Sequence, residues 1–138
     1  DEQEPRFGEH GEGPDVSFAF GDDLLLVDVS AVCPLADSYV EAEDSQPGAL
    51  LSRAEKEKVA TYGNFAQVRH MAFAPAVFNH MGVPGPQTLA LLRKLSSATA
   101  DPNGFMAHML MACGVAISQG NAKMVCAALA QWWDHGVR

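Results

Sequence analysis

The sequence predicts a mixed fold of the α/β or α+β class, in which helices flank a small mixed β-sheet. Two strand-like segments, Val16–Phe20 and Asp23–Val32, are separated by the turn-forming pair Gly21-Asp22. A segment of helical composition, 49–62, follows them, and a further extended segment occupies 65–78. Strands that alternate with helices in this way are typical of a small sheet covered by helices.

The predicted hairpin places two aspartates face to face. A two-residue loop at Gly21-Asp22 sets the register so that Asp15 lies directly opposite Asp28. Opposed side chains have β-carbons about 5 Å apart, where like charges destabilise the sheet. We therefore expect a cation between the carboxylates, and Mg²⁺ suits such a pair because it prefers oxygen ligands and keeps part of its hydration shell. In the alternative interpretation a register slip separates the two residues, and Asp28 simply faces solvent.

The 49–62 helix carries charges within its apolar stripe. Cys33-Pro34 ends the second strand, and the polar, irregular segment 35–48 leads to the helix, which Gly63-Asn64 is expected to stop. Residues at helical spacing on one face are Leu51, Glu55, Lys58 and Tyr62. Either Glu55 and Lys58 form a surface pair at i,i+3, or they mark a site on the face that meets the sheet.

The rest of the chain is predicted to be one strand and three helices. Pro75 indicates that the 65–78 strand is an edge or irregular strand, and the 49–62 helix should cross between it and Asp23–Val32 in the right-handed sense. A turn at 82–86 precedes a helix over 87–95, and a break at 101–104 precedes helices over 105–118 and 121–133, joined around Gln119-Gly120. We expect residues 1–95 to form the core and 96–138 a helical extension packed on the same domain.

Composition and charge limit the class of protein. With 138 residues, 48% hydrophobic and 19% charged, the chain fits one globular domain. No apolar run has the length of a membrane span, and the acidic N-terminal residues do not resemble a signal peptide. Cys33, Cys113 and Cys126 form no metal or redox motif, so an intracellular protein with reduced thiols is expected. The net charge of −8 argues against a stand-alone nucleic-acid binder.

An ordered series of motifs resembles a known nuclease family. The series consists of Pro14-Asp15, Asp28-Val29-Ser30, Cys33-Pro34-Leu35-Ala36-Asp37-Ser38-Tyr39, Pro47-Gly48, Glu55-x-x-Lys58-x-x-x-Tyr62, Phe73-Ala-Pro75-Ala-Val77, Gly82 and Gly85. It resembles the restriction-enzyme-like endonuclease domain of site-specific non-LTR retrotransposon reverse transcriptase proteins, which belongs to the PD-(D/E)xK group. The resemblance covers about residues 13 to 95.

The resemblance implies a restriction-endonuclease-like core and a divalent-metal-dependent DNA endonuclease that cuts target DNA for retroelement insertion. It implies a nuclear location and DNA as a partner, within a larger multidomain reverse transcriptase protein. Asp15, Asp28 and the Val29 carbonyl would hold Mg²⁺ or Mn²⁺. Ser30 stands where the wider group has its lysine, so the resemblance implies that Lys58 has taken over that role from the helix. Glu55 would act as an outer ligand or position the lysine, with Ser30 and Tyr62 as auxiliary residues.

Two other functions remain open at this point. The nuclease fold can serve as a catalytically inactive docking module, with the methionine-rich C-terminal helices as its interface, which the acidic balance favours. A junction-resolving nuclease would use similar chemistry on branched DNA. For the enzyme, Asp28→Ala is expected to abolish cleavage and to leave the metal-free protein equally or slightly more stable, because opposed like charges are removed.

Overall fold

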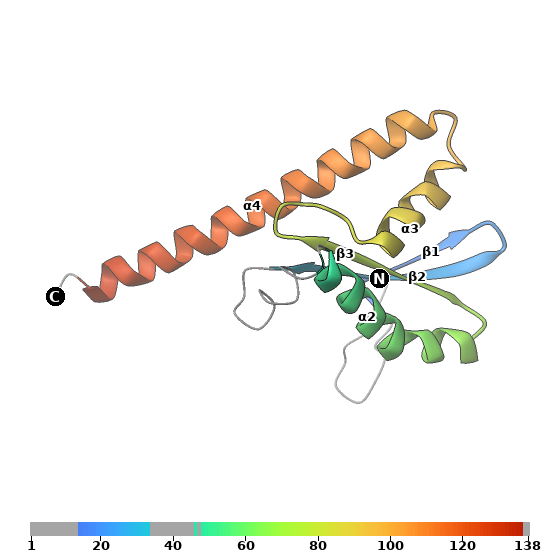
Figure 1. Ribbon diagram of the computed structural model, residues 1–138, viewed down its shortest axis with the longest axis horizontal. Coiled ribbons are helices and arrows are strands. Elements are labelled where there is room, and N and C mark those ends of the chain that lie inside the picture. The colour runs from blue at the N-terminus through green and yellow to red at the C-terminus, as the bar shows by residue number, and fades with distance from the viewer. Residues whose placement is uncertain (1–13, 34–45, 47, 137–138) are drawn as a thin grey trace, which may run out of the picture.

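The computed structural model describes residues 14–33, 46 and 48–136 (Figure 1). The strands in this part of the chain are β1 (Val16–Phe20), β2 (Asp23–Val32) and β3 (Ala72–Asn79), and the helices are α2 (Ala49–Val68), α3 (Pro86–Ser96) and α4 (Pro102–Gly136). The strands form a mixed sheet in the order β1-β2-β3, in which β1 and β2 are antiparallel and β2 and β3 parallel. The predicted mixed class with a small sheet is therefore confirmed. Most of the predicted irregular segment 35–48 lies outside the described residues.

The hairpin has the predicted strands and the predicted register. Val16 pairs with Val27 and Phe20 with Asp23, so Gly21 and Asp22 form the two-residue loop. Gly21 has a φ of 64°, in the left-handed region that glycine adopts without steric cost. A glycine at the first loop position is typical of a type II′ turn, whose twist matches that of the flanking strands.

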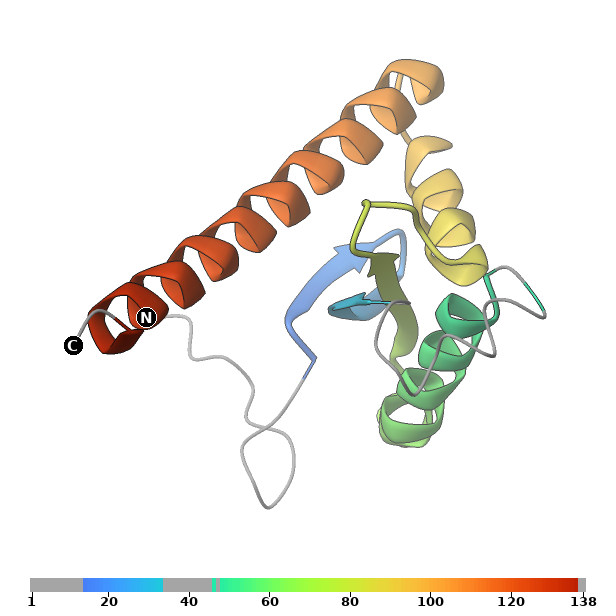
Figure 2. The same ribbon diagram turned by 60° about the vertical axis from the view of Figure 1, so that its left-hand side comes forward.

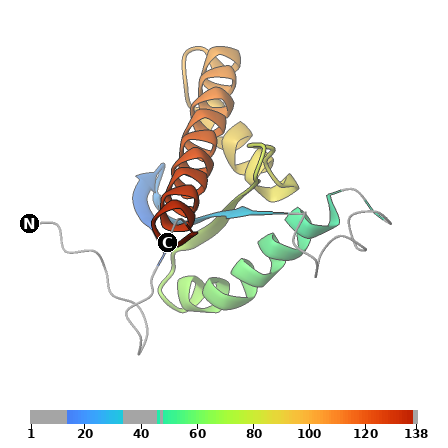
Figure 3. The same ribbon diagram turned by 90° about the vertical axis from the view of Figure 1, so that its left-hand side faces the viewer.

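Helix α2 covers one face of the sheet, and α3 and α4 lie on its other side (Figure 3). The start of α3 also contacts α2 directly. One face carries a hydrophobic cluster of Leu25, Val27, Ala76, Phe78 and Leu91, against which Cys113 and Ile117 of α4 pack. Side chains alternate along a strand, so Leu26 and Asp28 point to the face that α2 covers. Burying each large aliphatic side chain contributes about 1.5–3 kcal/mol, which makes the central strand β2 the main support of the core.

Helix α2 is longer than predicted, because Gly63-Asn64 does not stop it. A glycine inside a helix costs only about 1 kcal/mol relative to alanine, and burial of Ala66 (1% exposed) on the next turn offsets that cost. The helix ends instead at a Schellman motif, in which the Met71 N–H donates to the Ala66 carbonyl and the His70 N–H to the Gln67 carbonyl. His70 takes the left-handed position with a φ of 56°. As a result β3 begins at Ala72, not at residue 65.

The predicted edge strand and the helix after it agree with the structure. In the described sheet β3 lies at one edge, which accommodates Pro75 because its missing N–H faces away from β2. Helix α3 begins at Pro86 and ends at Ser96, within a residue of the predicted bounds.

The prediction of two C-terminal helices is wrong, since α4 runs unbroken over 35 residues (Figure 2). Asp101 caps it: its Oδ1 accepts from the Gly104 N–H at 2.9 Å, and its carbonyl accepts from the Phe105 N–H at 3.0 Å. The Asp-Pro-Asn-Gly break is thus the start of a helix, with proline at the favoured first position. Gln119-Gly120 contains no proline, and one interior glycine is too weak to end a helix with good helix formers on both sides.

Candidate active site

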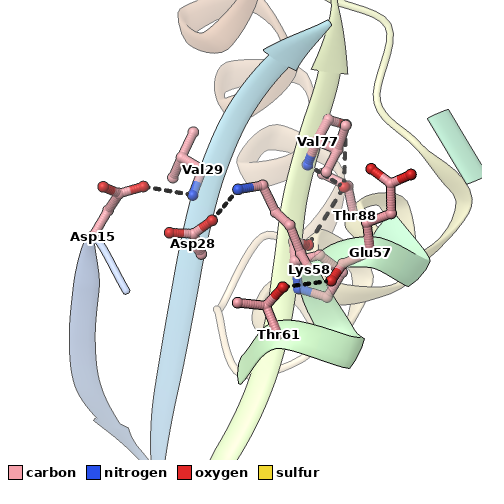
Figure 4. A network of polar contacts seen from close by, with 9 residues as sticks. Asp15, Asp28, Val29, Glu57, Lys58, Thr61, Val77 and Thr88 are labelled. Carbon is pink, nitrogen blue, oxygen red and sulfur yellow. Dashed lines mark hydrogen bonds and ion pairs between the residues drawn. The ribbon is translucent and has the colours of Figure 1, made fainter. Parts of the chain in front are cut away.

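Strand β2 and helix α2 bring Asp28 and Lys58 together. Asp28 is buried (5% exposed) on the face of the sheet that α2 covers. The Lys58 ammonium donates to Asp28 Oδ2 and forms an ion pair with it. The side chain of Lys58 is 22% exposed, and that of Asp28 is 7% exposed. Solvent screens a pair at this depth less than it screens a surface pair. The lysine on the helix therefore reaches the predicted carboxylate on the strand (Figure 4).

Asp15 lies at the start of β1, across the hairpin from Asp28. It directly precedes Val16, and Val16 and Val27 form the last pair of the hairpin, so the pairing of Asp15 with Asp28 stays a prediction. Its carboxylate turns toward β2 and accepts a hydrogen bond from the Val29 N–H at 2.7 Å (Figure 4). This hydrogen bond joins Asp15 to the residue that follows Asp28 on β2. This contact with the Val29 N–H was not predicted, and the Val29 carbonyl as a metal ligand stays a prediction.

Glu55 has a different partner from Lys58, although the two residues are less than one turn apart. It is 1% exposed, and its carboxylate accepts from the Gln87 N–H at 3.1 Å, the Thr88 N–H at 2.8 Å and the Thr88 hydroxyl at 2.9 Å. These donors belong to the first turn of α3, where unpaired N–H groups and the helix dipole favour an anion. Glu55 thus anchors α3, and the interpretation of Glu55 and Lys58 as a surface pair is wrong.

Thr88 extends this anchor to the sheet. Its hydroxyl oxygen accepts a hydrogen bond from the Val77 N–H at 2.7 Å, so one buried side chain joins α2, α3 and β3. Sequence reasoning missed Thr88, and the available signal was indirect. The first turn of α3 contains no acidic residue and Gly85 supplies no side-chain cap, so its N–H groups need an acceptor from another element.

The predicted auxiliary residues Ser30 and Tyr62 lie on β2 and α2 respectively. Ser30 follows Asp28 on the same face of β2, opposite Val77 of β3. The Tyr62 ring packs against Phe73, with ring centroids 5.5 Å apart, as expected for a residue of the core stripe. Lys56 and Glu57 are exposed. Glu57 pairs with Arg53 on the outer side of α2 at 2.9 Å, a contact worth at most about 0.5 kcal/mol at such exposure.

Two carboxylates are what the described residues offer to a metal. Among the described side chains no group of three or more His, Cys, Asp or Glu residues could hold an ion. Mg²⁺ does not require such a group, since it is usually bound by one or two carboxylates together with water and substrate phosphates. Asp15 and Asp28 as the ligands of such an ion stay a prediction, and Lys58 already neutralises part of the charge of Asp28.

Comparisons of the chain with protein-family models, curated proteins and solved structures give no match. In the described part of the chain, no helix has the length and apolarity required to cross a membrane.

Proposed function

We propose that this protein is a divalent-metal-dependent DNA endonuclease with a restriction-endonuclease-like core. The observation that carries the proposal is the contact between Lys58 on α2 and Asp28 on β2, next to Asp15. Lys58 and Asp28 are 30 positions apart in the sequence, and Asp15 accepts a hydrogen bond from the N–H of Val29, the residue after Asp28. They are also the two acids and the lysine that the motif resemblance assigns to phosphodiester hydrolysis.

The donor set supports hydrolysis of a phosphodiester. A metal ion held by Asp15 and Asp28 would polarise the scissile phosphate and lower the pKa of a bound water. Lys58 would place a positive charge beside the phosphate, where negative charge develops in the transition state. Asp28 holds the lysine ammonium in position, and the Val29 N–H holds the Asp15 carboxylate.

The resemblance suggests the substrate and its context. The DNA would be the insertion target of a retroelement, and the protein would act within a larger reverse transcriptase protein. A net charge of −8 gives weak affinity for DNA, because few basic residues are available for phosphate contacts. We therefore propose that other modules of that protein recognise the target DNA.

A cleavage assay on supercoiled plasmid tests the proposal. The wild-type protein should convert the plasmid to nicked or linear DNA with Mg²⁺ or Mn²⁺, but not with EDTA. Asp28→Asn and Lys58→Ala should each lower the rate at least about a hundredfold, as expected for groups that act directly in the reaction. Matched controls are Asp23→Asn, an exposed aspartate of β2, and Lys56→Ala, an exposed lysine of α2. Both controls should cleave within about twofold of wild type, as surface substitutions away from the site do.

Two outcomes of this assay would change the proposed substrate or exclude the proposed site. Cleavage of branched DNA in preference to plasmid duplex would indicate a junction-resolving nuclease. Equal activity in Asp28→Asn and Asp23→Asn would show that the chemistry does not use the candidate site.

A docking module is the second candidate, and the ion pair itself favours it. Because Lys58 neutralises Asp28, the folded protein needs no metal ion at this position. A nuclease fold without activity would keep the pair for stability alone. Absence of cleavage together with absence of metal binding would support this candidate.

A further inference from the structure

An exposed apolar stripe runs along α4 at coiled-coil spacing. Its members alternate by four and three residues: Met111, Val115, Ser118, Ala122, Val125 and Leu129. The large members are half or more exposed, at 63% for Met111, 50% for Val115, 58% for Val125 and 60% for Leu129. Ser118 is the polar member of the stripe, and monomeric proteins rarely leave large apolar patches in water.

The stripe is not the side of α4 that packs on the body of the protein. Cys113 and Ile117 contact the hydrophobic cluster, and the Asn121 side-chain amide donates to the His80 carbonyl at 2.9 Å. Gly114 contacts the β3–α3 loop, where a β-carbon on Gly82 would lie 2.8 Å from the Gly114 α-carbon. The C-terminal half of α4 then extends beyond the sheet (Figures 1 and 2). The stripe members Val125 and Leu129 belong to this half of the helix.

The spacing defines the kind of partner. Alternation by four and three gives a repeat of 3.5 residues, which a partner helix matches when the two supercoil with interlocking side chains. Val115, Ala122 and Leu129 take the a positions, and Met111, Ser118 and Val125 the d positions. Small side chains at Ser118 and Ala122 allow two backbones to approach closely at the middle of the stripe.

The charge distribution favours a second α4 as the partner. The chain has a net charge of −8, so most of its surface repels another copy. From residue 102 to 133 the sequence contains no acidic residue, and Lys123 is its one lysine or arginine. Lys123 takes a b position, on the outer side of a coiled coil. Two copies can therefore meet along α4 without bringing their acidic residues together.

We propose that α4 forms a two-stranded coiled coil with α4 of a second copy of this chain, through the stripe from Met111 to Leu129. This association does not depend on the nuclease chemistry. It would join two candidate sites in one particle.

Oligomeric state in solution tests the association. Light scattering coupled to size exclusion, in reducing buffer because Cys33 and Cys126 are exposed, should give twice the monomer mass of 14.7 kDa at high protein concentration. Dilution should shift the wild-type protein toward monomer. A protein that remains monomeric at every concentration, or that forms large aggregates, overturns the proposal.

A pair of neighbouring substitutions tests the stripe itself. Val125→Glu places a charge at a core position, and should raise the dimer dissociation constant at least about tenfold. Met124→Glu is the control, because Met124 is equally exposed (65%, against 58% for Val125) but lies outside the stripe. It should change the constant by less than about threefold, as a substitution on the outer face does. Circular dichroism should show unchanged helix content in both variants, and equal effects of the two would contradict the stripe as the interface.

Discussion

At the scale of single residues, the ion pair with Lys58 changes the effect that the Asp28 carboxylate is expected to have on the stability of the fold. Two opposed carboxylates by themselves repel, and this was the basis for expecting Asp28→Ala to be neutral or stabilising. In the structure the ammonium of Lys58 binds Asp28, so the folded state already contains a compensating cation. Removing the carboxylate leaves a partly buried ammonium without this partner, which is costly.

Asp28→Ala should therefore lower the free energy of unfolding, by about 1–3 kcal/mol for a pair that is only partly buried. The double variant Asp28→Ala/Lys58→Met should recover most of the loss, because it removes both charges and keeps the apolar stem. Urea denaturation in EDTA measures all the variants without a divalent metal. An Asp28→Ala protein as stable as wild type would show that the pair contributes nothing to folding.

Cys113 gives a second prediction at this scale. Burial raises the pKa of its thiol, because the thiolate loses solvation beside the hydrophobic cluster. In a limited alkylation at pH 8, Cys33 and Cys126 should react first and Cys113 much more slowly, as mass spectrometry of the digest would show. The raised pKa means that the folded state holds the proton more tightly, so this thiol should lower the stability as pH rises above its ordinary pKa. Cys113→Ser should reduce that alkaline loss, and alkylation of Cys113 as fast as Cys126 would contradict its burial.

At the scale of elements, the contact between Glu55 and α3 determines where α2 sits. The carboxylate satisfies N–H groups at the start of α3, and Thr88 links the same point to β3. Gly85 is required by this packing: a β-carbon there would lie 2.2 Å from Glu55 Oε1. Since Lys58 follows Glu55 on the same helix, this anchor also sets the position from which the lysine reaches Asp28.

Two glycine substitutions should therefore have opposite signs. Gly85→Ala should destabilise the protein by about 2 kcal/mol or more, because the methyl group displaces the Glu55 carboxylate from its buried donors. Gly63→Ala should stabilise it by about 0.5–1 kcal/mol, since Gly63 is in a helix interior and the nearest atom, Val59 Cγ1, would be at an ordinary 3.6 Å. Thermal or urea denaturation measures both, and a stabilising Gly85→Ala would exclude the tight contact with Glu55.

At the scale of the whole molecule, metal binding and folding should be linked. The folded state alone brings Asp15 to the strand that carries Asp28, so an ion that binds both carboxylates would stabilise the fold by mass action. At a concentration a hundred times its dissociation constant, the ion would add about 2.7 kcal/mol.

The wild-type Tm should accordingly rise with Mg²⁺ or Mn²⁺, by several degrees for about 2.7 kcal/mol of stabilisation in a domain of this size. Asp28→Asn should abolish the rise, and Asp23→Asn should retain it. Differential scanning fluorimetry against an EDTA baseline measures the shift. If the Tm is the same with and without either metal, and the plasmid is not cut, the docking module becomes the better account of the protein.

Local patterns in the sequence were enough to predict the hairpin, its register and the start of α2. Each depends on neighbouring residues: Gly21-Asp22 sets the turn, and the turn sets which side chains face each other. The position of Lys58 near Asp28 was expected from the motif resemblance and from the crossing of the helix near the end of the second strand, because no local spacing relates a helix residue to a strand residue 30 positions away.

The tertiary structure decided the ends of the helices and the partner of Glu55. Gly63 and Gly120 weaken a helix by an amount that packing or a cap elsewhere can offset, so the local signal did not determine where α2 and α4 end. Glu55 is separated from Thr88 by 33 residues, and it binds α3 because the unpaired N–H groups there need a buried acceptor. Turn geometry is a property of adjacent residues, whereas the pairing of buried polar groups depends on which elements the hydrophobic core brings together.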